Sequence, residues 1–343
     1  MSCDLPDELL ALCLAPLPYA ELATAVVRVC RHWHELRLSP HFRAARADVD
    51  ERGLVVAERY EDSYRANRLC RVLVGGRWCE RASLPHVFDG RSTSFRGELV
   101  LLGCDELGTP RCRAFNLEAN AWRTLSWNGN NVAACCGTDT VVVALSRTVF
   151  AGDHGRLMSL RPGSAEGWVP IPDPPIDVLA CYDDYPPSFC CVDDVFYVVG
   201  GAKGNGDCSD ALQGFDLSTR SWKVRAPLPQ PRCYATCTQL GGRLFVVGGD
   251  LKGGYDDRLR AEVFSYDPRA DRWRSESPLP LDTYGGGSRS AMVRAVAHEG
   301  RVVVVGIKAA PPLALVGGAW TELPPLPPSG TTRSRYMASL RLC

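Results

Sequence analysis

The chain has 343 residues, of which 45% are apolar and 23% charged. This composition is typical of a folded globular protein and excludes a disordered chain, a collagen or a long coiled coil. The 39 Lys and Arg residues balance the 39 Asp and Glu residues, so the chain lacks the basic surface that non-specific binding to nucleic acids or anionic membranes requires. We therefore expect partners selected by shape, with neither nucleic acid nor membrane among them.

The expected location follows from the absence of membrane and export signals. The longest apolar runs, such as 141–145 and 302–305, are far shorter than the roughly 18 residues of a membrane-spanning helix. No basic residue precedes Arg28, which is the reverse of a secretory signal or a transit peptide. We expect a protein of the cytoplasm, the nucleus or both. In either compartment the 16 cysteines are expected to be thiols that fill the core.

The sequence offers little for metal, cofactor or catalytic chemistry. It contains no Cys-x2-Cys pair, and the adjacent pairs Cys135-Cys136 and Cys190-Cys191 would point to opposite faces of a strand. The glycine-rich run 200–206 is not followed by the helix of a phosphate-binding loop. No Gly-x-Ser-x-Gly nucleophile motif is present. We predict no metal, no cofactor and no catalytic residue.

Residues 1–47 have the pattern of three short helices. The first is expected to begin at Leu5-Pro6-Asp7-Glu8, because proline and carboxylates suit a first turn, and to end at Pro16 and Pro18. Further helices are expected over 19–27 and 28–38, and Ser39-Pro40 should end the last. Helices this short bury little surface, so part of their apolar side should bind a partner.

From residue 54 onward the sequence repeats. In the two clearest units, 195–232 and 244–289, an apolar run ends in two glycines, an aromatic residue lies seven positions before a tryptophan, and Pro-Leu-Pro follows. The other four units keep only part of this pattern. A unit of about 48 residues forms one four-stranded sheet, and such sheets bury their faces by stacking radially in a β-propeller. Six units fill residues 54–343. The tryptophans that set the period are Trp78, Trp122, Trp168, Trp222, Trp273 and Trp320.

Two further expectations concern how such a ring is built. The segment 335–342 is similar to the strand that follows Arg232, yet no further unit comes after it. We expect it to join the sheet begun by Leu54–Ala57, so that the first and last repeats share one blade. The glycine pairs should adopt positive φ and permit a close approach of backbones where the inner strand meets the centre.

Both segments resemble known families. Leu5-Pro6-Asp7-Glu8-Leu9-Leu10, with Leu17-Pro18 and Val29-Cys30-Arg31-His32-Trp33 at their spacing, resembles the F-box, and the repeats resemble kelch repeats. The predicted fold is mostly β: a small three-helix F-box over 1–47, a short linker over 48–53, and a six-bladed kelch-type β-propeller over 54–343. Because 43–52 is charged and contains neither Gly nor Pro, we expect it to continue a helix and hold the propeller rigidly.

An F-box followed by a kelch propeller resembles the substrate receptors of Skp-cullin-F-box ubiquitin ligases. The resemblance implies a non-catalytic adaptor that binds a Skp-type adaptor and a cullin scaffold at one end and a protein substrate, of a kind the sequence does not specify, at the other. The implied adaptor-binding residues are Leu5, Pro6, Leu9, Leu14, Leu17, Leu22, Val29, Cys30 and Trp33. The implied substrate-binding residues, in loops that share one face of the propeller, are Lys203, Asn205, Arg232, Tyr234, Lys252, Tyr255, Tyr284 and Arg289.

Two alternatives stay open at this stage. One is a kelch interaction scaffold that acts outside any ligase. The other is a copper radical oxidase, whose fold kelch propellers resemble. An oxidase site needs several His and Tyr ligands on the propeller axis, and only His86, His154 and His298 lie outside the helical segment.

Overall fold

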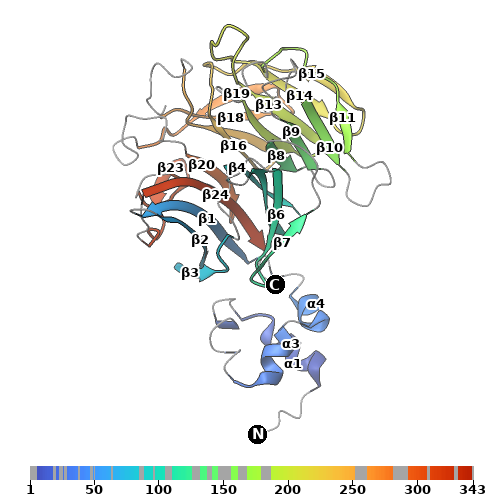
Figure 1. Ribbon diagram of the computed structural model, residues 1–343, viewed down its shortest axis with the longest axis vertical. Helices are drawn as coiled ribbons and strands as arrows, with labels where there is room; N and C mark the ends of the chain where they lie inside the picture. Colours follow the sequence, from blue (N-terminus) through green and yellow to red (C-terminus); the bar gives the residue numbers. More distant parts are fainter. Residues whose placement is uncertain are drawn as a thin grey trace.

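The computed structural model has a helical part near the N-terminus and a much larger β part (Figure 1). It describes residues 6–17, 21–22, 26, 29–37, 39–46, 49, 51–62, 65–84, 89–95, 97–104, 110–125, 132–136, 141–145, 156–160, 168–178, 187–251, 261–280, 293–306, 310–327 and 331–341. None of these residues forms a helix long and apolar enough to cross a membrane.

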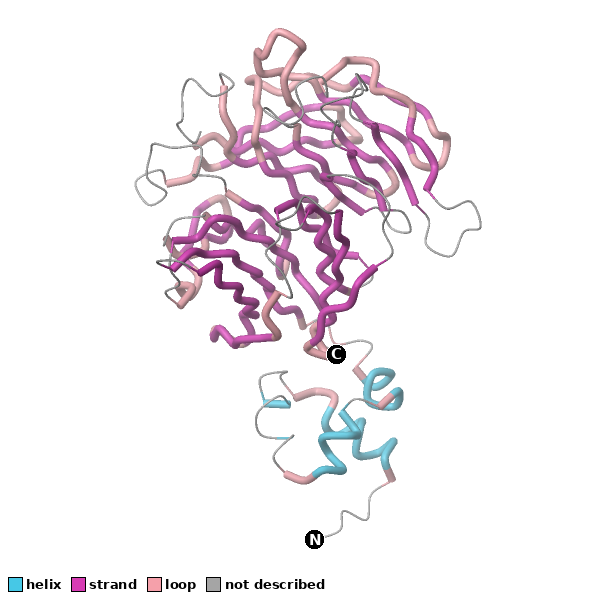
Figure 2. The backbone as a smooth tube through the Cα atoms, in the orientation of Figure 1, coloured by secondary structure: helices cyan, strands magenta, loops and turns pink. Residues whose placement is uncertain are grey.

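We call residues 6–46 the helical module. Its described helices include α1 (Asp7–Leu14), α3 (Arg31–Arg37) and α4 (Pro40–Ala45), and helices are cyan in Figure 2. These helices pack around a small core of their own that includes Leu10, Leu14, Leu22 and Phe42. The sequence prediction was incomplete at Ser39, since Ser39-Pro40 ends one helix and also begins α4. The Ser39 Oγ accepts a hydrogen bond from the Phe42 N–H (3.2 Å), as an N-cap does.

Other helix boundaries also differ from the prediction. The third helix covers 31–37 rather than 28–38, and α4 ends at Ala45 instead of continuing through the linker. Most of the predicted helix over 19–27 lies outside the described residues. The linker prediction missed a different form of attachment between the helices and the propeller, which depends on the buried Arg46.

The described strands form six antiparallel four-stranded sheets. The first contains β24 (Thr331–Arg341), β1 (Arg52–Asp62), β2 (Arg65–Val74) and β3 (Arg77–Arg81). The second contains β4 (Asp89–Phe95), β5 (Glu98–Cys104), β6 (Pro110–Asn116) and β7 (Ala121–Leu125), and the third β8 (Val132–Cys136), β9 (Val141–Leu145), β10 (Arg156–Leu160) and β11 (Trp168–Ile171). The fourth contains β12 (Ser188–Val192), β13 (Val195–Val199), β14 (Leu212–Asp216) and β15 (Ser221–Val224). The fifth contains β16 (Thr236–Leu240), β17 (Arg243–Val247), β18 (Val263–Asp267) and β19 (Arg272–Glu276), and the sixth β20 (Arg294–His298), β21 (Arg301–Val305), β22 (Leu313–Val316) and β23 (Ala319–Glu322).

These sheets are arranged in a closed ring. The first strands of successive sheets contact one another in the order β4, β8, β12, β16, β20 and β24, and β24 contacts β4 again. The second strands, such as β13 and β17, are continuous apolar runs because neighbouring blades cover both of their faces. The fourth strands, such as β15 and β23, are largely exposed. The predictions of a mostly β fold and of a β-propeller are therefore confirmed.

Side chains near the ring axis join the inner strands of neighbouring blades. Each inner strand is a sheet edge, whose free backbone groups need partners. Thr238 Oγ1 on β16 accepts a hydrogen bond from the Ala297 N–H on β20 (2.9 Å), and Ser92 Oγ on β4 accepts one from the Met337 N–H on β24 (3.2 Å). Short hydroxyl side chains at these positions therefore satisfy edge groups and connect the blades.

The repeating tryptophans join each blade to the one before it. For five of the six, the indole N–H donates to a backbone carbonyl of the segment that precedes its own blade, and the distances lie between 2.7 and 2.9 Å. The same bond thus recurs around the ring, which explains why tryptophan sets the period of the sequence. The five described pairs are Trp78 with Pro324, Trp122 with Ala82, Trp222 with Pro172, Trp273 with Ala226, and Trp320 with Ser277.

The two ends of the propeller sequence meet in the first sheet. β24 pairs with β1 from Arg52↔Arg341 to Glu61↔Thr331. An ion pair between Arg71 and Glu58 (2.8 Å), both buried, reinforces this sheet, and Arg71 also donates to the carbonyl of Pro327 (3.1 Å). The ring is therefore closed by main-chain pairing as well as by side chains.

Candidate functional site

The helical module has an unusually apolar exterior. Leu9 is 49% exposed, Leu12 58% and Val29 57%. Among the described residues, only Val224 and Val316 are other large hydrophobic side chains with comparable exposure. Exposed apolar side chains concentrated in a small part of a molecule are typical of protein-binding surfaces. Leu12 was not among the predicted binding residues, although its position three residues after Leu9 on α1 indicates the same side of the helix.

The predicted adaptor-binding residues divide into exposed and buried groups. Pro6, Leu9, Val29 and Cys30 are exposed, and Leu9 and Val29 carry most of the apolar surface. The buried or half-buried group packs in or against the helical core and consists of Leu14, Leu22, Leu17 and Trp33. Leu5 lies outside the described residues. The exposed residues are therefore available for direct contact with a partner, whereas the buried residues hold the helices together.

Arg46 connects the helical module to the first strand of the propeller. Its side chain is 1% exposed, and its guanidinium donates to the carbonyls of Ala15 (2.8 Å) and Leu17 (2.7 Å) at the end of α1. It also pairs with the carboxylate of Glu51 (2.7 Å), one residue before β1. A buried cation with three acceptors holds α1, α4 and the start of the propeller in one arrangement.

The predicted substrate-binding loops lie side by side. We call residues 200–211, after β13, and 230–235, before β16, the rim loops. The Gly201 N–H donates to the Arg232 carbonyl (2.8 Å), and the Arg232 N–H donates to the Ser209 carbonyl (3.0 Å). A Cβ on Gly200 would lie 2.1 Å from the Arg232 oxygen, and Gly200 has φ +65°. The glycine pair therefore allows close approach as predicted, but it does so after the second strand, at the junction with the next blade, and not at the inner strand.

The exposed tip of the first rim loop is a tight polar turn. The Lys203 N–H donates to the Asp207 carbonyl (2.9 Å), and the Gly206 N–H donates to the Lys203 carbonyl (2.8 Å). The Asn205 amide donates to the Asp207 carboxylate (2.7 Å). Lys203 and Asn205 are both exposed, so this turn presents an ammonium and an amide to solvent at a fixed position.

Two predicted substrate-binding residues are structural parts of the second rim loop. Arg232 is 1% exposed, donates to Gln230 (2.9 Å) and Glu262 (3.2 Å), and lies over the ring of Phe264. Tyr234 is half-buried and has φ +55°, a left-handed conformation that is uncommon for a bulky residue. The other four predicted residues, Lys252, Tyr255, Tyr284 and Arg289, lie outside the described residues.

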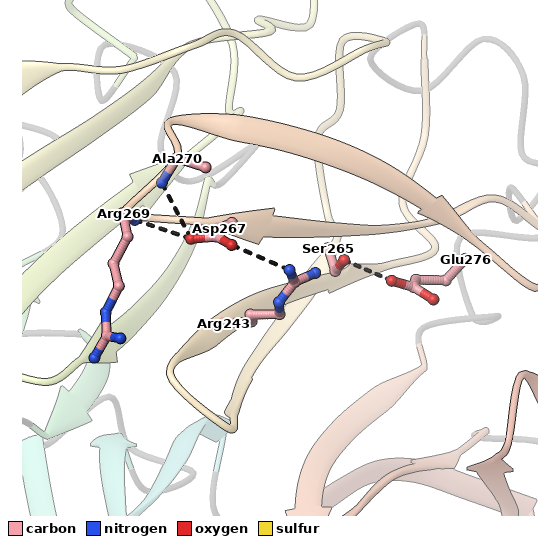
Figure 3. A network of polar contacts seen from close by, with 6 residues as sticks. All are labelled: Arg243, Ser265, Asp267, Arg269, Ala270 and Glu276. Atoms are coloured by element: carbon pink, nitrogen blue, oxygen red, sulfur yellow. Dashed lines mark hydrogen bonds and ion pairs between the residues drawn. The ribbon is translucent and has the colours of Figure 1, made fainter.

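The Phe-Asp and Tyr-Asp pairs of the repeats have a structural explanation. Asp267 accepts hydrogen bonds from the N–H groups of Arg269 (3.0 Å) and Ala270 (3.2 Å) and one from the Arg243 guanidinium (3.1 Å), as Figure 3 shows. The hydrogen bond from Ala270 is the largest of the effects that lower the pKa of Asp267. In the preceding blade, Asp216 caps the equivalent turn. These carboxylates hold the β18–β19 and β14–β15 turns, so they are not candidates for catalysis.

The expectation that all cysteines are thiols was wrong for one pair. Cys208 and Cys233 form a disulfide between the two rim loops, with a Cα–Cα distance of 5.5 Å. They are 25 residues apart in sequence, and only the fold brings them together. Burial raises the pKa of the free thiols of Cys70 and Cys237 to about 12.

The described residues do not provide the metal site of an oxidase. No group of three or more His, Cys, Asp or Glu side chains in the described ranges is placed to hold a metal ion. His298, on the inner strand β20, is buried and its Nδ1 lies 3.0 Å from Ser339 Oγ on β24. A cavity of about 290 Å³ on the axis is lined mainly by hydroxyl, thiol and small apolar side chains, among them Ser92, Thr238 and Cys190. His86 and His154 lie outside the described residues.

Comparison with known proteins agrees with this architecture. Residues 185–229 and 231–280 each match a kelch motif family. The chain contains kelch repeats. These matches lie within the fourth and fifth sheets, so the F-box interpretation of the helical module stays a prediction.

Several kelch proteins and one F-box protein are similar to parts of the chain. Kelch repeat and BTB domain-containing protein 12 of Danio rerio is 27% identical over 118 residues, which are 32% of this chain and 18% of that protein. Kelch-like protein 35 of Mus musculus is 34% identical over 84 residues, 24% of this chain and 13% of its own length. F-box protein AFR of Arabidopsis thaliana is 31% identical over 78 residues, 23% of this chain and 20% of its own. The chain therefore aligns with less than a third of each of these proteins.

A solved structure supports the fold over a longer range. The structure of YjhT matches 80% of this chain and 97% of its own, with a TM-score of 0.55 and 12% identity. At this identity the likeness establishes the fold alone. Together these findings show kelch motifs over residues 185–229 and 231–280 and a propeller fold for the β part as a whole.

Proposed function

We propose that this protein is the substrate receptor of a Skp-cullin-F-box ubiquitin ligase, active in the cytoplasm, the nucleus or both. In this proposal the helical module binds a Skp-type adaptor, and the propeller holds a protein substrate at its rim loops for ubiquitination. The protein itself catalyses no step. Its role is to hold the substrate at a fixed position relative to the cullin scaffold.

The observation that carries the proposal is the apolar exterior of the helical module. Its three exposed hydrophobic side chains, Leu9, Leu12 and Val29, belong to a module with a separate core and no described strand. A module this small gains stability by burying such side chains against a partner. The similarity to F-box protein AFR supports the identification of that partner as a Skp-type adaptor.

Adaptor capture tests the proposal directly. The purified full-length protein is mixed with a Skp-family adaptor and a cullin, and the complex is isolated by affinity and size-exclusion chromatography. We expect a stable complex for the wild type. The double variant Leu9→Asp/Leu12→Asp should lose at least about tenfold in affinity, because two apolar anchors become charged. Replacing Leu5-Pro6 by Ala-Ala should also lower the affinity for the adaptor.

A matched control separates loss of the interface from loss of solubility or folding. Val224, on the outer strand β15, is 55% exposed, close to the exposure of Leu12. Val224→Asp should leave adaptor affinity unchanged. If the folded wild type binds neither adaptor nor cullin, the ligase assignment is wrong, and the propeller would then act as an interaction scaffold outside a ligase.

A further inference from the structure

The two rim loops are connected by a covalent bond at the place where the candidate substrate surface lies. The Cys208–Cys233 bond is buried, with 6% exposure of Cys208 and none of Cys233. Its neighbours on the surface are the exposed turn at Lys203 and Asn205 and the half-buried Tyr234. A change at this bond therefore acts directly on the candidate surface.

The site accommodates the reduced pair as well as the disulfide. The Cys233 sulfur lies 3.3 Å from the Gly201 carbonyl, so a thiol at this position has an acceptor ready for its proton. The Cα–Cα distance of 5.5 Å is within the ordinary range of disulfides, so the bond fits this arrangement of the two backbones. The backbone bonds between Cys233 and Asp250 (3.0 and 2.8 Å) hold that loop in either state.

The Cys208–Cys233 pair differs from the other cysteines whose state the structure describes. Eight of these are free thiols, and two of the eight, Cys13 and Cys30, are exposed. In a compartment that keeps thiols reduced, a disulfide is usually transient. The expected cytoplasmic or nuclear location would therefore make this bond reversible.

We propose that Cys208 and Cys233 are a reversible redox site, and that its oxidation fixes the rim loops in the arrangement seen here. With a peroxide as oxidant, one thiolate attacks a peroxide oxygen, and hydroxide leaves to give a sulfenic acid. The second thiolate attacks that sulfur and water is released. In total, two thiols and one hydrogen peroxide give one disulfide and two waters. A dithiol reverses the reaction through a mixed disulfide, and Cys208 is the more exposed of the two residues.

The structural consequence concerns the first rim loop. The ends of its exposed turn, 203–207, are joined by the backbone bridge between Ala202 and Cys208. In the oxidised state the disulfide also ties Cys208 to the second rim loop. Reduction removes the covalent constraint and leaves hydrogen bonds alone to hold the turn. The redox site is independent of the ligase assignment, and only its effect on substrate capture rests on the proposed function.

The first experiment measures the redox state of the full-length protein without any partner. The protein is equilibrated in glutathione buffers of graded potential, remaining thiols are alkylated, and peptides are mapped by mass spectrometry. We expect a cross-linked peptide containing Cys208 and Cys233 that disappears with a two-electron Nernst dependence. If both residues stay fully alkylated at oxidising potentials while the protein remains folded, the proposal is wrong. Circular dichroism shows whether the protein stays folded during reduction. If the bond can be reduced only when the protein unfolds, the proposal is also wrong.

The second experiment measures the rim itself by hydrogen exchange. Peptides from 200–211 should exchange about tenfold faster or more in the reduced protein, whereas peptides from 293–305 should not change. Cys208→Ser should show the fast exchange at every potential. Cys237→Ser, a free half-buried cysteine on β16, is the matched control and should behave as the wild type. Equal exchange in both redox states would overturn the fixing of the rim. Neither experiment uses the adaptor, so the redox proposal can be confirmed or refuted independently of the ligase proposal.

Discussion

Replacing Trp273 tests whether the recurring indole bond joins the blades. Trp273 lies opposite Tyr266 in the β18–β19 register, with ring centroids 5.1 Å apart, and its N–H donates to the Ala226 carbonyl (2.8 Å). Trp273→Phe removes the donor and keeps most of the ring, which should cost about 1 kcal/mol. Trp273→Ala also removes the ring and should cost about 3 kcal/mol, since the side chain is only half-buried.

These free energies translate into modest but measurable thermal shifts. Unfolding the propeller region, 54–343, involves an entropy of about 0.6 kcal/mol/K at about 2.1 cal/mol/K per residue. The Phe variant should therefore melt about 2 °C lower than the wild type and the Ala variant about 5 °C lower. Differential scanning calorimetry measures both values, and urea denaturation gives an independent free energy.

The outcome that refutes the reasoning is specific. If Trp273→Phe is as stable as the wild type, the indole hydrogen bond contributes nothing, and the period of the sequence has another origin. If it is as unstable as Trp273→Ala, the ring that phenylalanine retains contributes nothing, and the expected excess of packing over the hydrogen bond is wrong. Trp222→Phe is an internal comparison, because its bond to Pro172 (2.7 Å) is more exposed to solvent and its loss should cost less.

Three further predictions concern closure, backbone geometry and pH. Deleting residues 336–343 leaves most of β1 without its partner, so circular dichroism should show loss of a cooperative melt, and a wild-type transition would contradict the closure. Gly249→Ala places a Cβ 2.7 Å from the Cys233 oxygen at φ +93°, whereas Gly242→Ala at φ +72° meets nothing within 4 Å. Urea denaturation should therefore show the Gly249 variant to be less stable than the Gly242 variant by about 1–3 kcal/mol, and equal values would refute the close approach. Burial lowers the pKa of His298, so the unfolded chain takes up a proton first as the pH falls through about 6.5 and stability is lost below that pH. His298→Gln should reduce the fall in melting temperature between pH 7 and pH 5. If the melting temperature falls as steeply as in the wild type, another group causes the pH dependence.

Much of the propeller could be predicted because its repeat has a direct physical basis. Tryptophan recurs since each blade uses its indole to reach the previous blade, and the aromatic seven residues earlier is its partner across the sheet, as with Phe215 and Trp222. The aspartate after that aromatic caps the following turn. Local and neighbouring contacts of this kind leave a periodic trace in the sequence.

Features that depend on distant segments left no such trace. The Cys208–Cys233 bond joins two blades, and nothing near either cysteine distinguishes it from the free thiols. The role of Arg46 depends on carbonyls at Ala15 and Leu17, about 30 residues away, which resemble any other backbone groups in sequence. The family resemblance nominated Arg232 for substrate binding or for a role in the repeat itself, and its buried guanidinium lies over Phe264 in the next blade.

The topology places the two proposed binding regions at opposite ends of the propeller strands. β1 begins at Arg52, opposite Arg341 at the end of the inner strand β24, so the helical module joins the propeller where inner strands end. The rim loops follow the second strand β13 and precede the inner strand β16, which is where inner strands begin. An adaptor at the helices and a substrate at the rim would therefore not compete for surface. Their relative orientation would depend on the joint at Arg46 and Glu51, so a change at that joint should alter ubiquitin transfer while leaving both binding affinities intact.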